Sequence, residues 1–136
     1  MNQATASRMV ILLVEDNAEM REFVMRALEL LGHRAIDVGD GASALAKLAE
    51  RADINVLLTD VMLPGGLNGA ELARTARGLR HDLKILFMSG YAETAIDANE
   101  LRQFAALMLA KPFRVQQLDE RLKALWTKPR PAALLS

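Results

Sequence analysis

Short apolar runs of strand length alternate with segments of helical periodicity along most of the chain. Nearly continuous apolar runs are typical of strands that are covered on both faces of a sheet. The sequence predicts five strands, at residues 9–14, 34–38, 54–59, 83–88 and 107–110. Because helical segments separate these strands, the pattern predicts right-handed crossovers and a parallel sheet with helices on both faces.

The helical segments carry apolar residues three and four positions apart. Asn17 and Asn68 are the expected N-caps of the first and third helices, and Gly32 is the expected end of the first. Residues 91–106 predict only a short or irregular helix, since polar residues of low helix propensity interrupt them. A final amphipathic helix is expected over residues 115–125. The positions expected to face the core in the second and third helices are Leu45, Leu48, Ala49, Leu72, Ala73, Ala76 and Leu79.

Length and composition indicate one domain. With 136 residues, of which 51% are hydrophobic, the chain can bury a core but is too short for a second folded domain. We expect one domain over residues 9–126, a disordered segment at residues 1–8 and a flexible tail at residues 127–136. The longest apolar runs fall far short of the roughly 20 residues that a membrane helix needs. Since the N-terminus is also polar, we expect neither export nor membrane insertion.

The charge balance and the cysteine count exclude several function classes. The 17 basic and 17 acidic side chains cancel, and no block of lysine or arginine stands out, so the electrostatic footprint of nucleic-acid binding is missing. The sequence contains no cysteine, which excludes disulfides, thiolate catalysis and cysteine metal sites and fits a cytoplasmic location. His33 and His81 are expected in surface turns, not as ligands or phosphate carriers.

Polar side chains stand where four of the apolar runs stop. Glu15 and Asp16 follow VILLV, Asp60 follows INVLLT, Ser89 follows LKILFM, and Lys111 follows LMLA. The carboxyl ends of parallel strands meet at one edge of the sheet, where the ligands of such sheets bind. Each motif alone would be a helix cap, a turn or a solvated strand end. Together, carboxylates, a hydroxyl and an ammonium group at one edge suit a divalent metal and a phosphoryl group.

Each of these residue types has a chemical use at such a site. Magnesium prefers oxygen ligands and keeps several waters, so Glu15, Asp16 and Asp60 would suit it. Three converging carboxylates raise the pKa of at least one of them unless a cation relieves their repulsion. An aspartate can attack phosphorus to form an acyl phosphate. Lys111 would then pair with phosphoryl oxygens, and Ser89 would donate a hydrogen bond to another.

Four segments, ILLVEDN, TDVMLP, FMSGY and KPF, resemble in order and spacing the signatures of response-regulator receiver domains of two-component signalling. The resemblance runs from about Met9 to Trp126. It implies an α/β fold in which a doubly wound, five-stranded parallel sheet of order 2-1-3-4-5 is flanked by helices, as in flavodoxin. The segment PGGLNG, with FMSGYAE and KPF, is most similar to receiver modules of hybrid sensor histidine kinases. The chain is therefore expected to be a free-standing receiver or a module of a larger protein.

The resemblance also assigns roles to the strand-end residues. It implies that Asp60 is the phosphoacceptor and that Glu15 and Asp16 belong to the Mg2+ site, together with the backbone carbonyl of Met62. Glu15 stands where the family more often has aspartate, so its longer side chain is expected to reach Mg2+ through a water. The loop over residues 64–69 has one residue more than the usual family pattern, which leaves the start of the third helix open.

Further implied roles concern how a signal leaves the site. Ser89 would be the switch hydroxyl and Lys111 the phosphate-sensing lysine, followed by a cis bond to Pro112. Met108 occupies the position where many family members keep a rotating aromatic residue, so the usual coupling from serine to aromatic residue is broken. Tyr91, two residues after Ser89, is a candidate to replace it.

The function implied is that of a phosphoacceptor switch. A sensor histidine kinase or a histidine phosphotransfer protein would phosphorylate Asp60, and the affinity for a downstream protein partner would change. The expected state is a monomer or a phosphorylation-dependent dimer. One alternative is a phosphorylation-independent interaction module. A magnesium-dependent aspartyl-phosphate phosphatase is disfavoured, because phosphatases resembling haloacid dehalogenase need an aspartate where this chain has Met62, so we expect no enzyme beyond slow self-dephosphorylation.

Overall fold

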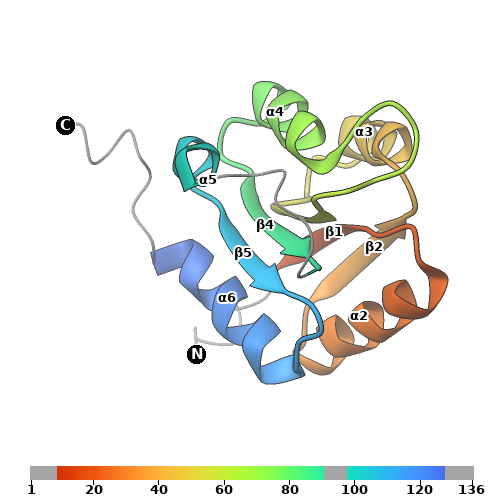
Figure 1. The fold of residues 1–136 in the computed structure, drawn as a ribbon, viewed down its shortest axis with the longest axis vertical. Helices are drawn as coiled ribbons and strands as arrows, with labels where there is room; N and C mark the ends of the chain where they lie inside the picture. Colours follow the sequence, from red (N-terminus) through yellow and green to blue (C-terminus); the bar gives the residue numbers. More distant parts are fainter. Residues whose placement is uncertain (1–8, 91–97, 128–136) are drawn as a thin grey trace.

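The computed structural model describes residues 9–90 and 98–127. Over these residues five strands alternate with five helices (Figure 1). The elements are β1 (Val10–Val14), α2 (Ala18–Leu30), β2 (Arg34–Val38), α3 (Gly41–Glu50), β3 (Val56–Asp60), α4 (Gly69–Leu79), β4 (Lys84–Ser89), α5 (Ala98–Phe104), β5 (Leu107–Ala110) and α6 (Val115–Thr127). The expected disordered segment 1–8, the switch candidate Tyr91 and residues 128–136 of the expected tail lie outside the described residues. The first residue of that tail, Thr127, is the last residue of α6.

The strands form one parallel sheet in the order β2-β1-β3-β4-β5. This confirms the predicted α/β fold class and the doubly wound strand order. The register pairs Val14 with both Val38 and Thr59, and it pairs Ser89 with Ala110. The carboxyl ends of β1, β3, β4 and β5 therefore reach the same edge of the sheet.

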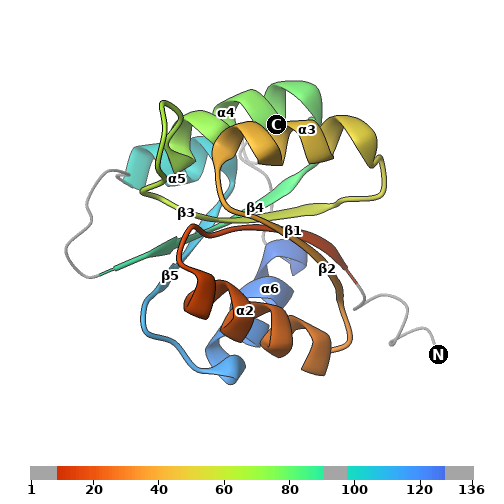
Figure 2. The same ribbon diagram turned by 90° about the vertical axis from the view of Figure 1, so that its right-hand side faces the viewer.

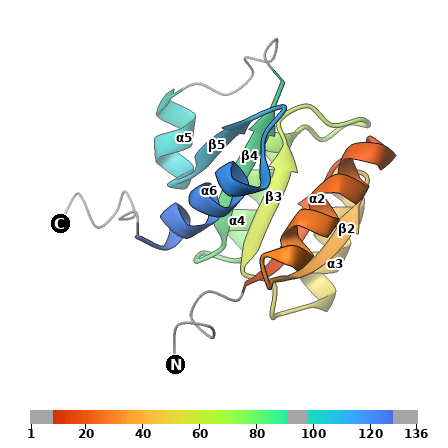
Figure 3. The ribbon, with the colours of Figure 1, turned by 90° about the horizontal axis from the view of Figure 1, so that it is seen from below.

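Two helical layers cover the sheet. Helices α2 and α6 lie on one face, and α3, α4 and α5 lie on the other (Figures 2 and 3). Alternate residues of each strand point to opposite faces, so Ile11 and Leu13 pack with α2 and α6, while Leu12 and Val14 pack with α3 and α4. Burial on both faces explains why the central strands are almost continuously apolar.

Side-chain caps fix the helix starts that position the site. Asn17 Oδ1 accepts a 2.8 Å hydrogen bond from Met20 N–H, as predicted for the first helix. Asn68 and Glu71 form a reciprocal capping box, which places the start of α4 at Gly69 despite the longer loop. A Cβ on Gly69 would lie 2.1 Å from the carbonyl oxygen of Asp60, so only glycine allows this loop to approach the end of β3.

Three predictions about burial were wrong. Leu79 is 59% exposed. The residue after it, the C-cap Arg80, points inward instead and donates to the carbonyls of Ile54 and Leu48. Ala49 is exposed, because the buried positions of α3 are Gly41, Ala44 and Leu48. His33 is not a surface residue: it is 9% exposed, and its Nδ1 accepts a hydrogen bond of 3.1 Å from Met9 N–H.

Among the described residues no helix is long and apolar enough to cross a membrane.

Candidate functional site

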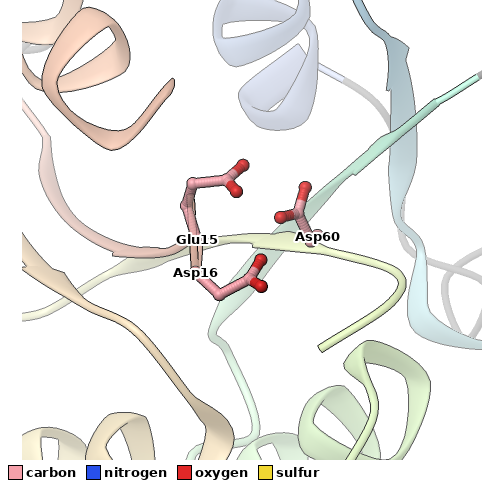
Figure 4. A group of neighbouring side chains, drawn as sticks. All are labelled: Glu15, Asp16 and Asp60. Carbon is pink, nitrogen blue, oxygen red and sulfur yellow. The ribbon is translucent and has the colours of Figure 1, made fainter. Parts of the chain in front are cut away.

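Side chains from the ends of three strands converge at one edge of the sheet. Asp60 is the last residue of β3, Glu15 and Asp16 follow β1 directly, and Lys111 follows β5. The side chains of Glu15, Asp16 and Asp60 lie close together at this edge (Figure 4). Ser89 ends the neighbouring strand β4, and its hydroxyl donates a 3.1 Å hydrogen bond to the carbonyl of Gly90.

The three carboxylates form a compact group of oxygen ligands. One oxygen from each of Glu15, Asp16 and Asp60 can be chosen so that all three lie within 4.8 Å of one another. Glu15 is 1% exposed and Asp60 4% exposed, whereas Asp16 is open to solvent. The group therefore has two buried members and one open side through which a ligand can enter.

One ammonium group serves both buried carboxylates. Lys111 Nζ lies 2.6 Å from Asp60 Oδ1 and 2.9 Å from Glu15 Oε1. The second oxygen of Glu15, Oε2, accepts a 3.0 Å hydrogen bond from Asn17 N–H. Glu15 thus has partners on both oxygens. Asp60 Oδ1 has the ion pair with Lys111, but it is buried without a hydrogen bond of good geometry from any described residue.

These surroundings separate the acidities of the two buried carboxyl groups. Burial, helped by the neighbouring Glu15 carboxylate, raises the pKa of Asp60 to about 8, although Lys111 acts against the increase. Burial also raises the pKa of Glu15, but hydrogen bonds with Asp60, Asn17 N–H and Lys111 outweigh it, so this pKa lies below its ordinary value. Burial lowers the pKa of Lys111, but its contacts with Asp60 and Glu15 raise it overall. The pKa values of the two buried carboxyl groups are therefore pushed apart, and that of Asp60 is the higher.

This arrangement fits a divalent cation. Its donors are carboxylate oxygens alone, which are the ligands that Mg2+ and Ca2+ prefer. Burial raises the pKa of Asp60, with a further contribution from the neighbouring Glu15, and a cation beside the three carboxylates would favour their charged forms. Met62 lies two residues after Asp60 and is 55% exposed. A thioether is a poor ligand for these cations, so only its backbone carbonyl is suited to bind the ion.

Comparison with known proteins identifies the family. The family model for the response regulator receiver domain matches residues 11–123, most of the chain. The chain belongs to the response-regulator receiver domain family. Receiver domains bind Mg2+ at an acidic pocket, and in this chain the acidic group that could hold a metal is Glu15, Asp16 and Asp60. The resemblance read from the four sequence segments is confirmed.

Curated relatives include free-standing and multidomain proteins. The receiver is 37% identical over 115 residues to the response regulator receiver protein CpdR of Brucella abortus, covering 85% of this chain and 94% of that protein. It is 33% identical over 119 residues to the sensor kinase CckA of the same species, covering 87% of this chain but 12% of the kinase. It also matches 54% of the response regulator MprA of Mycobacterium tuberculosis at 37% identity, with 90% of this chain covered.

Solved structures show the same fold. The receiver domain of the hybrid histidine kinase CckA superposes with a TM-score of 0.70 at 30% identity, covering 85% of this chain and 97% of that one. The chemotaxis protein CheY4 of Vibrio cholerae superposes with a TM-score of 0.74 at 26% identity, covering 90% and 99%. A receiver domain protein of Clostridium thermocellum gives 0.80 at 19% identity, covering 94% and 99%, which supports the fold alone.

The remaining sequence-based expectations have mixed outcomes. The Lys111–Pro112 bond is cis, as the resemblance implied. Met108 lies half-buried in β5, and its carbonyl accepts a 3.0 Å hydrogen bond from Arg121 Nε. Sequence reasoning missed Arg21, whose guanidinium reaches the backbone of Glu15. Its only signal in the sequence is its place one helical turn after the cap Asn17.

Proposed function

We propose that this receiver is a phosphoacceptor switch in which Asp60 accepts the phosphoryl group. The observation that carries the proposal is the buried carboxylate pair of Asp60 and Glu15 held by the single ammonium group of Lys111. A carboxylate in such a place is shielded from water yet beside a cation that can pair with phosphoryl oxygens. Its neighbour Asp16 leaves the site open on one side.

The transfer step is a displacement at phosphorus. An oxygen of deprotonated Asp60 forms a bond to phosphorus, while the phosphorus–nitrogen bond of a donor phosphohistidine breaks. The imidazole leaves with that electron pair and takes up a proton from solvent, to which Asp60 has released its own proton before the attack. Lys111 holds the charge that develops on the phosphoryl oxygens, and Ser89, at the end of the next strand, supplies a hydroxyl for one of them.

Mg2+ is the proposed cofactor. Glu15, Asp16, Asp60 and the backbone carbonyl of Met62 would hold it, and it would neutralise charge on the transferring group. Glu15 already binds Asn17 N–H and Lys111 through its two oxygens, which supports contact with the ion through a water. The exposed side chain of Met62 has no group that could orient a hydrolytic water. We therefore infer a slowly hydrolysed acyl phosphate, not a phosphatase.

The proposed donors are a sensor histidine kinase or a histidine phosphotransfer protein, and we place the exchange in the cytoplasm. This is supported by the relationship to the receiver of CckA, which is described as a sensor kinase and a hybrid histidine kinase. Phosphorylation adds up to about two negative charges and strong acceptor oxygens. We infer that this charge changes the affinity of the receiver for a downstream protein partner or for a second copy.

A small acyl-phosphate donor tests the proposal without a kinase. The wild-type protein with Mg2+ and acetyl phosphate should gain the mass of one phosphoryl group, and Asp60→Asn should gain none. Asp53→Asn is the matched control, because Asp53 is an exposed carboxylate paired with Arg51. No mass gain, or a gain that survives Asp60→Asn, would refute the assignment. Partner binding that is unchanged by beryllofluoride would instead support a phosphorylation-independent module.

A further inference from the structure

Arg21 links three elements beside the acidic group. It lies in the first turns of α2, which runs next to β2 (Figure 3). Its Nη1 donates a 2.8 Å hydrogen bond to the carbonyl oxygen of Glu15, and its Nε lies 3.2 Å from Asp37 Oδ2 on β2. The guanidinium therefore bridges the turn after β1 and the end of β2 with two different nitrogens at once.

The contact with Glu15 acts on the peptide that joins the two acidic residues. The carbonyl of Glu15 belongs to the rigid plane that ends at the Cα of Asp16. On the other side, Glu15 N–H donates a 3.1 Å hydrogen bond to the carbonyl of Val38. With both backbone groups of Glu15 fixed, the direction in which Asp16 leaves the strand is fixed as well. Asp16 is exposed, so its orientation depends on this backbone more than on packing.

We propose that Arg21 is a positioning residue for the divalent cation. This proposal rests on the proposed function, because it takes Glu15, Asp16 and Asp60 as the metal site. Arg21 sets the angle between the Glu15 and Asp16 side chains, so that both carboxylates are presented to one ion together with Asp60. Carboxylates that are not already oriented bind metal more weakly, because part of the binding free energy is then used to order them.

If only the charge of Arg21 mattered, removing it would strengthen Mg2+ binding, whereas a positioning role predicts weaker binding. A positive charge beside a cation site disfavours the cation, so its removal should strengthen Mg2+ binding if charge alone mattered. Removal of Arg21 also leaves the partly exposed carboxylate of Asp37 without its ion pair, which would further attract Mg2+. A loss of affinity in an Arg21 variant can therefore be explained by geometry but not by charge.

The test is Mg2+ titration by calorimetry on the full chain at fixed pH and ionic strength. We expect Arg21→Gln to weaken binding on the order of tenfold, the usual cost of losing a group that orients metal ligands. Arg21→Lys restores the charge but not the two-nitrogen bridge, so it should recover only part of the affinity. Arg26→Gln is the matched control, since Arg26 is an exposed arginine of the same helix paired with Glu22, and it should bind Mg2+ like the wild type.

A charge-neutral double variant separates the two explanations. Arg21→Gln with Asp37→Asn removes both members of the ion pair, and it should still bind Mg2+ more weakly than the wild type. Thermal unfolding in chelator checks that each variant is folded. At saturating Mg2+ the variants should still gain a phosphoryl group at Asp60. Equal or tighter Mg2+ binding by Arg21→Gln would overturn this inference alone, whereas a wild type that gains no phosphoryl group would overturn the proposed function.

Discussion

Replacing Asp60 by asparagine should stabilise the metal-free protein at neutral and mildly alkaline pH. The pKa of Asp60 is raised from 3.8 to about 8 by burial and by Glu15. In the unfolded chain this carboxyl releases its proton near pH 4, whereas in the folded chain it keeps the proton to about pH 8. The free energy of unfolding therefore falls as pH rises from about 4 to about 8. Asparagine keeps the shape of the side chain and has no charge to bury.

The size of this effect follows from the two pKa values. At pH 7, which is about 3 units above the ordinary Asp pKa of 3.8, the folded chain still keeps this proton. Each unit corresponds to about 1.36 kcal/mol, so the raised pKa lowers the free energy of unfolding by about 4 kcal/mol. Two other shifts offset part of this destabilisation: the same contacts lower the pKa of Glu15 and raise that of Lys111. Both of those shifts stabilise the folded state at pH 7. We expect a net gain of about 1–3 kcal/mol for Asp60→Asn.

Urea unfolding in chelator at several pH values measures the effect. The difference between Asp60→Asn and wild type should be smallest near pH 4.5, increase up to about pH 8 and then level off. With Mg2+ added the order should reverse, since only the wild type keeps all three carboxylates for the ion. Asp53→Asn, which breaks an exposed pair with Arg51, should leave the stability close to that of the wild type at every pH tested. A variant that is less stable than wild type at pH 8, or a difference independent of pH, would refute the reasoning.

Three further predictions concern other polar groups. Lys111→Met leaves the buried carboxylates of Glu15 and Asp60 without their cation and should lower the stability of the metal-free protein by about 3 kcal/mol at pH 8 in urea unfolding. Arg80→Ala removes hydrogen bonds to four backbone carbonyls around the loop between α3 and β3, and calorimetry should show a loss of about 2–4 kcal/mol. Burial lowers the pKa of His33, whose neutral Nδ1 accepts from Met9 N–H, so stability should fall as pH drops below 6.5, and this component should be missing in His33→Gln.

The fold could be predicted because its main signals are local. Ile11, Leu12 and Leu13 are all fully buried, and such an unbroken apolar run identifies a central parallel strand before any partner is known. The position of the site follows from the same signal. Once Asp60 and Lys111 are placed at the ends of parallel strands, topology brings them to one edge, and their ion pair of 2.6 Å agrees with that placement.

The features that could not be predicted depend on contacts between distant residues. Helical spacing and apolarity favour Leu79 as the inward residue at the end of α4, and only the distant carbonyls that Arg80 binds explain why Arg80 points inward instead. His33 looks like a turn residue after Gly32, but the backbone of Met9 gives its ring a buried partner 24 residues away. The bridging contacts of Arg21 likewise could not be predicted, because its ion pair forms only when β2 brings Asp37 beside it. Helical spacing records which side of a helix is apolar, but not which polar side chain finds a buried acceptor.

Counting charges explains why the proposed acceptor would need a divalent cation as well as lysine. The cluster has three carboxylates, and Lys111 is the ammonium group that contacts its two buried members. In the metal-free protein, burial and the neighbouring Glu15 raise the pKa of Asp60 to about 8, so a proton competes for the carboxyl group that would attack phosphorus. A phosphoryl group would add up to about two more negative charges to the same place. In the proposed switch, Lys111 would orient and sense the phosphoryl group, but one ammonium group cannot by itself balance the charge of both the ligands and the phosphoryl oxygens.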